Sequence, residues 1–154
     1  MDADAWLRKF VREHQAVAGI VYERGDSGLL LMVAAYQLPP LVVASARVVS
    51  RGQGLAGLAF ERNAALSTCT GRKRPTRFAP LSPLPEESAV ALPVHDKRGD
   101  VRALVYLVFP ESKRLRDDEL VFMLDRASTF NVGHTSLPQP WPQDADASGV
   151  FSAT

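Results

Sequence analysis

Apolar residues near the start of the chain recur with a helical period among charged neighbours. Across residues 4–14 the apolar positions on one face are Trp6, Leu7, Phe10 and Val11. Steps of three and four residues place side chains on the same side of a helix. The spacing therefore predicts an amphipathic helix whose apolar stripe covers a core.

A second helical pattern lies near the C-terminus and opens with acidic residues. Asp117 is predicted as its N-cap, and Asp118 and Glu119 favour the positive end of a helix. The apolar stripe that follows consists of Leu120, Met123, Leu124, Ala127 and Phe130, and is widened by Val121 and Phe122. The two predicted helices enclose most of the ordered chain between them.

Between these helices, apolar runs have the length and composition of β-strands. The expected strands lie within residues 17–23, 29–38, 41–50, 64–68, 88–95 and 101–109. Turn residues at 24–28 and 96–100 join the first two runs and the last two runs as hairpins. The run 29–38 alternates apolar residues on both of its faces, which predicts a strand covered on both sides. Pro93, inside the fifth run, is typical of an edge strand or a bulge.

A glycine-rich corner follows residues 46–50 and leads into a short helix. Gly52, Gly54 and Gly57 carry it. Glycine tolerates positive φ and lets another backbone come close, so these residues predict a tight turn from strand to helix. No Lys-Ser or Lys-Thr pair follows, which argues against a phosphate-binding loop. We expect the glycines to let the helix pack closely on the sheet.

The composition is that of one ordinary globular domain. The 154 residues are 46% hydrophobic and 23% charged, and the net charge of +1 provides no field to attract nucleic acid or an anionic membrane. A single cysteine fits a reducing compartment, and no run approaches the roughly 20 apolar residues that span a bilayer. We expect a cytoplasmic protein with one domain over residues 1–134 and a flexible, proline-rich tail or linker over 135–154.

Three pieces of the sequence together resemble the GAF family of sensory and regulatory domains. They are the corner at Gly52, Gly54 and Gly57, the strand ending in Leu92-Pro93-Val94, and residues 114–120. The resemblance covers roughly residues 4–134. It implies an α+β fold with an antiparallel sheet of five or six strands and the N- and C-terminal helices on one face. PAS and roadblock-type domains share this layout, but the corner and the proline strand favour GAF.

The resemblance also implies where ligands and partners bind. Residues 70–87, which carry four prolines and a basic cluster, would cover a ligand pocket. The residues implied for that pocket are Tyr36, Leu55, Leu58, Cys69, Arg72, Arg74, Arg77, Phe78, Leu92 and Tyr106. The first and last helices would lie together, and their apolar stripes would form the contact between two chains in a homodimer. The residues implied for that interface are Trp6, Phe10, Leu120, Met123, Leu124 and Ala127.

Cys69 and the histidines are the candidates for chemistry. Cys69 is either a redox thiol, whose pKa the neighbouring basic cluster would lower, or a small apolar filler. Some GAF-like proteins reduce free methionine sulfoxide, but that chemistry resolves a sulfenic acid with further cysteines, and this chain has none. The three histidines have no zinc-helix spacing. We expect no metal and no cofactor.

The sequence therefore predicts a non-enzymatic regulatory domain that acts in signal transduction. Two mechanisms remain open. In one, a small ligand enters the pocket and shifts the packing of the first and last helices across a dimer. In the other, side chains fill the pocket and the surface is a docking platform for an unknown signalling protein. A redox enzyme or sensor that uses Cys69 is the alternative.

Overall fold

The computed structural model describes residues 2–69, 88–110 and 113–130. Its elements in chain order are α1 (Ala3–Glu13), β1 (Ala18–Arg24), β2 (Leu30–Tyr36), α2 (Pro40–Ser45), β3 (Val48–Val49), α3 (Gly54–Arg62), β4 (Leu66–Ser67), β5 (Ala89–His95), β6 (Val101–Val108) and α4 (Asp117–Ala127). The strands form one six-stranded sheet in the order β3-β2-β1-β6-β5-β4, with every neighbouring pair antiparallel. The predicted α+β class and sheet are confirmed.

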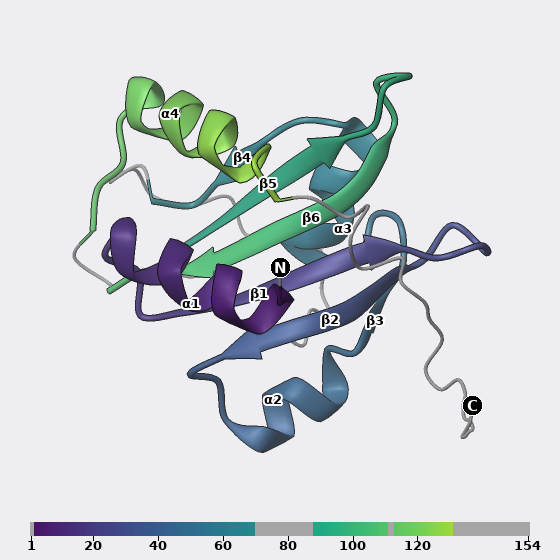
Figure 1. The fold of residues 1–154 in the computed structure, drawn as a ribbon, viewed down its shortest axis with the longest axis horizontal. Coiled ribbons are helices and arrows are strands. Elements are labelled where there is room, and N and C mark those ends of the chain that lie inside the picture. Colours follow the sequence, from purple (N-terminus) through teal and green to yellow (C-terminus); the bar gives the residue numbers. More distant parts are fainter. Residues whose placement is uncertain (1, 70–87, 111–112, 131–154) are drawn as a thin grey trace.

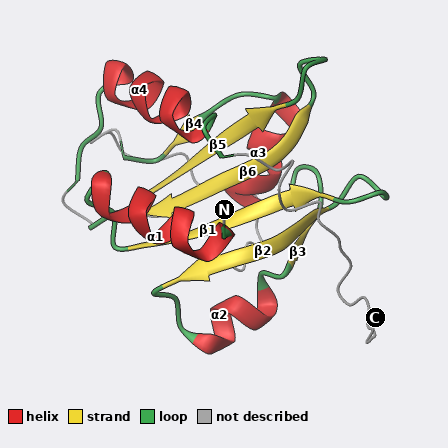
Figure 2. Ribbon diagram, in the orientation of Figure 1, coloured by secondary structure: helices red, strands yellow, loops and turns green. Residues whose placement is uncertain are grey.

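Helices cover both faces of this sheet. α1 and α4 lie side by side on one face, α3 lies on the other, and α2 lies near β2 at the edge (Figure 1, Figure 2). The prediction that the N- and C-terminal helices share one face is confirmed. The proposed division into a domain over 1–134 and a tail over 135–154 stays a prediction, because residues 131–154 lie outside the described residues.

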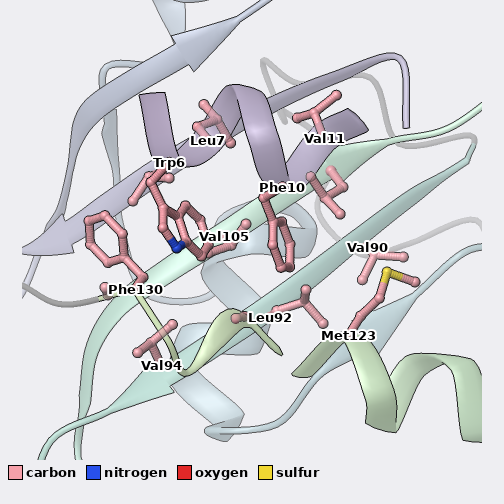
Figure 3. Packing of buried hydrophobic residues seen from close by; sticks show 14 of the residues in the cluster. Trp6, Leu7, Phe10, Val11, Val90, Leu92, Val94, Val105, Met123 and Phe130 are labelled. Carbon is pink, nitrogen blue, oxygen red and sulfur yellow. The ribbon is translucent and has the colours of Figure 1, made fainter. Parts of the chain in front are cut away.

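Apolar stripes of the two helices fill the core on their side of the sheet. The four stripe residues of α1 are all 8% exposed or less, and Met123 and Ala127 of α4 are buried with them. The sheet contributes Val90, Leu92 and Val105, which lie opposite the helices in Figure 3. Burying each such side chain contributes about 1.5–3 kcal/mol, so this core is a main source of stability.

The helix α4 starts at Asp117, with Arg116 rather than Asp117 as the N-cap. The Glu119 carboxylate accepts a hydrogen bond from the backbone N–H of Arg116 at 2.9 Å. The predicted N-cap is therefore wrong by one residue, whereas the acids predicted for the first turn do lie there.

A bulge in strand β2 reverses which of its residues face each of the two cores. Val21 pairs with Ala34 and Tyr22 pairs with Met32, which leaves Val33 as an extra residue. Before the bulge, Leu30 and Met32 belong to the core beneath α3. After it, Ala34 and Tyr36 pack toward α1 and α4. A regular alternation would place all four on one face of the strand, but the inserted residue reverses the alternation.

Residues 41–50 hold less strand than predicted. α2 occupies Pro40–Ser45, and the strand β3 is only Val48–Val49. Proline has its φ fixed near the helical value and needs no hydrogen-bond acceptor in a first turn, so Pro40 favours a helix start. The Ser45 hydroxyl then donates to the carbonyl oxygen of Leu41 at 2.8 Å. Valine-rich composition alone was a poor guide to this segment.

The glycine corner closes on itself as predicted. Gly52 and Gly54 have φ of +79° and +66°. The Gly52 N–H donates to Gly57 O at 2.9 Å, and the Gln53 N–H donates to Ser50 O at 3.1 Å. These backbone donors are used inside the corner. The corner therefore serves to dock α3 against the end of β3, and the interpretation as a packing corner rather than a phosphate loop is supported.

Strand β5 accommodates Pro93 because its outer neighbour is short. β4 pairs only with Ala91 and Val90, through Leu66 and Ser67. At Pro93 the strand has β6 on one side, where it pairs with Leu104. Pro93 thus lies on a locally open edge, where a missing N–H costs no ladder hydrogen bond.

Candidate functional site

The described residues of the predicted pocket do not share one cavity. Those on the α3 side are Leu55, Leu58 and Tyr106. Those on the side of α1 and α4 are Tyr36, Cys69 and Leu92. The remaining predicted pocket residues, Arg72, Arg74, Arg77 and Phe78, lie outside the described residues. A six-stranded sheet separates the two groups, so a single pocket lined by all of them is wrong. Binding by either group alone stays a prediction.

On the α3 side, the helix packs directly on the sheet. Leu55 and Tyr106 are 0% exposed, and Phe60 is 2% exposed. The buried hydroxyl of Tyr22 donates to the carbonyl oxygen of Ala46 at 2.7 Å, and burial raises the pKa of this phenol. The space directly beneath α3 is thus filled by side chains.

Cys69 has the surroundings of a structural residue. It is 1% exposed and belongs to the core beneath α1 and α4. Burial raises the pKa of its thiol. This effect outweighs the lowering of the pKa by the Ser67 hydrogen bond and by the charge of Lys113. Desolvation disfavours the thiolate, which weighs against the redox-thiol alternative. The basic cluster that this alternative invoked lies outside the described residues. The interpretation of Cys69 as an apolar filler is supported.

Most residues predicted for the dimer interface are used inside the chain. Trp6, Phe10, Met123 and Ala127 are 8% exposed or less. They cover the chain's own sheet, which leaves little of their surface for a second copy. The dimer interface stays a prediction. Leu120 and Leu124, by contrast, are only partly buried. The outer surface of α4 is instead formed by Val121 and Phe122, which are 64% and 59% exposed.

A continuous row of rings joins α1 to α4. Trp6 stacks on Phe10 with ring centroids 4.7 Å apart, and Phe130 meets Trp6 edge-on at 5.0 Å (Figure 3). The row continues from Phe10 to His14 at 4.5 Å and from His14 to Phe122 at 6.0 Å. Aromatic pairs at such separations attract one another beyond simple burial. We call these five residues the aromatic row, and it couples the positions of the two helices.

Two grooves follow the line of contact between α1 and α4. One has a volume of about 320 Å³ and is lined by Trp6, Phe10 and Arg126, among others. The other has a volume of about 620 Å³ and includes His14 and Phe122. Both include Glu13 in their walls. These two grooves therefore lie on the helix-pair side of the sheet, where the sequence analysis had placed the dimer interface and no ligand pocket.

His14 is a polar member of the aromatic row. Its Nε2 atom is fully buried and has no hydrogen-bond partner in the part of the chain that the structure describes. Burial lowers the pKa of the imidazole, Arg126 lowers it further, and Glu13 opposes both. A neutral imidazole between two phenyl rings is the state that these surroundings favour.

Arg102 links the sheet to the end of the last helix. Its guanidinium donates to the carbonyl oxygen of Phe130 at 2.7 Å and to that of His95 at 3.0 Å. Burial lowers its pKa, and Glu23 and Asp96 act in the opposite direction. The sequence analysis missed this residue. Arg102 lies at a bulge in β6 and bonds a residue far away in the chain, and no local sequence pattern indicates such a contact.

The remaining acidic residues and histidines of the described chain do not gather into a metal centre. Among the described residues no group of three or more His, Cys, Asp and Glu could hold a metal ion. His95 bonds the side-chain oxygen of Asn63 and so ties the end of α3 to the β5–β6 hairpin. None of the described helices is both long and apolar enough to cross a bilayer.

Comparisons with known proteins give structural relatives only. No protein-family model and no curated protein matches the sequence. The GAF domain of an Acinetobacter phosphoenolpyruvate-protein phosphotransferase is 18% identical, with a TM-score of 0.64 over 88% of this chain and 82% of that chain. The second GAF domain of DevS from Mycobacterium smegmatis is 17% identical, with a TM-score of 0.61 over 80% and 83%.

An enzyme has the same architecture. The type II free methionine-R-sulfoxide reductase of Thermoplasma acidophilum is 14% identical, with a TM-score of 0.64 over 80% of this chain and 83% of that chain. Identities this low establish architecture and leave activity open. The sheet order, the helices on its two faces and these similarities together show that this chain has the fold of GAF domains.

Proposed function

We propose that this chain is a non-enzymatic regulatory domain of signal transduction, which acts by binding a small ligand, a partner protein or both, as a homodimer. Its fold is that of domains found in a phosphotransferase and in a methyl-accepting chemotaxis protein. A shared fold is an analogy for function, so the proposal depends on the arrangement of the chain's own residues.

The observation that carries the proposal is the aromatic row between α1 and α4. These helices occupy the two ends of the described chain, yet Trp6 and Phe130 are in ring contact at 5.0 Å. A shift of one helix changes the packing of the other, because α1 rests on β1 and β2 while α4 rests on β5 of the same sheet. A ligand that favours one packing would thereby change the helix surface presented to a partner.

The outer surface of α4 is the dimer contact that we propose. Val121 and Phe122 are adjacent and largely exposed, and the partly buried Leu120 and Leu124 lie on the same helix. Exposed apolar patches on otherwise polar helices are typical of association surfaces. The dimer would thus use α4 beside the α1–α4 contact, while the buried stripe remains in the core.

Ligand binding on the α3 side is the second part of the proposal. Met32, Ala35, Val42 and Leu66 border that core and are only partly buried. Apolar side chains left partly exposed on a sheet face fit either a ligand or a docked protein. The segment 70–87 would cover them, as the family resemblance implies.

A redox activity of Cys69 is the alternative, and the similarity to a methionine sulfoxide reductase favours it. The burial of the thiol and its raised pKa weigh against it. The chain has one cysteine, so a sulfenic acid on Cys69 could be resolved only by a thiol from elsewhere.

Sedimentation equilibrium tests the dimer, using Phe122→Asp and Val121→Asp. Each variant should be monomeric at concentrations where the unmodified chain is dimeric, and should keep its thermal stability because both positions are exposed. Leu41→Asp is the matched control, since Leu41 is 83% exposed on α2, away from α4. Loss of association in the control alone, or a monomeric unmodified chain, would contradict the proposed contact.

Native mass spectrometry of protein purified from its own host tests the ligand. A reproducible mass increment that disappears on denaturation supports a bound small molecule. A chain that carries no ligand but copurifies with a different protein would favour the docking mechanism. Cell fractionation of that host tests the expected cytoplasmic location.

A further inference from the structure

The exposed side of α1 is positively charged in its middle. Arg8 and Arg12 lie one helical turn apart there and make no ion pair within the described residues. The third exposed cation, Lys9, lies 4.0 Å from Glu13, so these two charges largely offset each other. The other acid of the helix, Asp4, is in its first turn. The two arginines are therefore available to a partner.

The exposed side of α4 carries a negative charge at Asp125. This carboxylate makes no ion pair in the part of the chain that the structure describes. Asp118, two turns earlier, is paired with Arg116 at 3.0 Å. The neighbouring cation Arg126 lies on the side of α4 that faces α1, where it lines the smaller groove. The outer faces of α1 and α4 thus carry opposite unpaired charges.

The two helices run in opposite directions along their line of contact (Figure 1). Trp6, near the start of α1, contacts Phe130 after the end of α4, and His14, at the end of α1, contacts Phe122 within α4. Eight residues separate the two contacts on each side. Because each helical residue advances by about 1.5 Å, the helices stay in step between these contacts. By this count Asp125 is level with the turn of α1 that carries the two arginines.

We propose that the dimer has its two-fold axis along the line of contact between α1 and α4, so that each α1 packs on α4 of the partner subunit. The inference rests on the proposed dimer and specifies its arrangement. Rotation about an axis parallel to the helices keeps every residue at its own level and places α1 opposite α4. The partner subunit's Asp125 then lies level with the turn between Arg8 and Arg12. Phe122, which lines the larger groove at the line of contact, lies near the axis and faces its own copy.

An axis across the helices would instead bring like charges together. It would place α1 on α1 and α4 on α4, so that Arg8 and Arg12 face arginines and Asp125 faces its own copy. Val121 and Phe122 lie one turn before Asp125 and would be covered in either arrangement. The apolar pair therefore favours association, and the charges around it select the arrangement.

Charge reversal tests this arrangement by sedimentation equilibrium at low ionic strength, where exposed ion pairs are least screened. Arg12→Glu and Asp125→Arg should each weaken the dimer about tenfold, because attraction becomes repulsion at two symmetry-related places. A chain with both changes should associate within about twofold of the unmodified chain, since the pair is restored with reversed polarity. High salt should reduce the differences among these chains.

Arg62→Glu is the matched control. Arg62 is exposed in the last turn of α3, as Arg12 is in the last turn of α1, so both reversals lose the same kind of interaction with a helix dipole. The control changes the other face of the sheet and should leave the dimer unaffected. Thermal unfolding shows that each variant is folded, which matters because Arg12 also hydrogen-bonds the Tyr36 hydroxyl.

The outcomes separate the arrangement from the dimer itself. Unchanged association in both single variants, or a double variant weaker than either, would overturn the arrangement and leave the dimer standing. The neutral change Arg12→Gln should weaken association about threefold, whereas an axis across the helices requires it to tighten. A chain that is monomeric in every form would overturn the proposed dimer and the arrangement with it.

Discussion

The carbonyl oxygen of Ser50 occupies the place where a side chain at Gly57 would begin. A Cβ atom built on Gly57 would overlap this oxygen and would lie 3.1 Å from backbone atoms of Gly52. The helix α3 therefore approaches the end of β3 as closely as backbone allows. Both neighbours are main-chain atoms, so neither can rotate away.

Replacing Gly57 by alanine should destabilise the fold by about 3 kcal/mol, measured by urea unfolding. Helix propensity alone would give the opposite sign, since alanine in a helix is favoured over glycine by about 1 kcal/mol. The sign of the change thus separates the close approach from propensity. A Gly57→Ala chain as stable as the original would contradict the observed contact.

Gly28→Ala is the matched control for this substitution. Gly28 has a φ of +78°, and nothing lies within 4 Å of a Cβ built on it. Alanine at position 28 should lower the free energy of unfolding by about 1 kcal/mol, because only its left-handed backbone conformation is unfavourable. The Gly57 variant should therefore be clearly less stable than the Gly28 variant.

The corner shows what sequence can predict about this fold. Glycine at 52, 54 and 57 has few structural uses, so the local pattern was enough to place a tight turn and a closely packed helix. Strand β2 shows the limit. Its alternation was readable, but the bulge at Val33 depends on the pairing with β1, which no local pattern encodes. Tyr36 therefore lies on the opposite side of the sheet from Leu55 and Tyr106, with which the predicted pocket grouped it.

The candidate site was less predictable than the fold. Trp6, Phe10 and His14 are spaced four residues apart, so a ring row on α1 was visible in the sequence. Its continuation to Phe122 and Phe130 depends on how α4 lies against α1. The apolar stripes of α1 and α4 were assigned to a dimer interface. Their periodicity shows that these residues are covered, but it does not show whether the chain's own sheet or a second chain covers them.

Replacing Arg102 by methionine should loosen the end of α4. The substitution removes the hydrogen bonds to the carbonyl oxygens of Phe130 and His95, and hydrogen bonds to a charged group contribute about 1.5–3 kcal/mol each. Amide exchange measured by mass spectrometry should be faster in α4 and unchanged in α3. Arg24→Met is the control, because Arg24 makes only an exposed ion pair with Asp96 at 3.8 Å. Equal exchange in both variants would contradict this role of Arg102.

Cys69 should react slowly with a thiol reagent in the folded chain. Its thiol is buried and its pKa is raised by that burial, so reaction requires local opening. We expect the rate of modification by Ellman's reagent at pH 8 to be roughly 100-fold lower than in denaturant, the factor for an opening free energy of about 3 kcal/mol. A rate near that of the denatured chain would instead indicate an accessible, reactive thiol.

Substitutions of Cys69 distinguish an apolar filler from a nucleophile. Cys69→Ala should retain more stability than Cys69→Ser, because a hydroxyl in this core must find a partner at a cost of about 1–3 kcal/mol. Methionine sulfoxide reduction by either variant should equal that of the unmodified chain. A loss of reduction in both variants, with stability retained, would support the redox alternative.

His14 should make the fold less stable below neutral pH. Burial lowers the pKa of this imidazole from its ordinary value of 6.5, so below that pH the unfolded chain binds a proton that the folded chain refuses. The free energy of unfolding is therefore unaffected by His14 protonation above pH 6.5. It decreases as the pH falls from 6.5 toward the lowered pKa of His14 in the folded chain. His14→Leu should remove this loss. It should also raise stability by about 1 kcal/mol at pH 8, because the unpartnered Nε2 is gone.

Thermal unfolding at pH 8 and pH 5.5 measures both effects in the same samples. Acidic side chains also change protonation over part of this range, so the informative quantity is the difference between the original chain and His14→Leu. The variant should lose less stability than the original between the two pH values. The exposed His95, which bonds Asn63, supplies His95→Gln as the control for loss of any histidine. Parallel losses in the original chain and His14→Leu would mean that His14 does not cause the pH dependence and that the helix contact tolerates a charged imidazole.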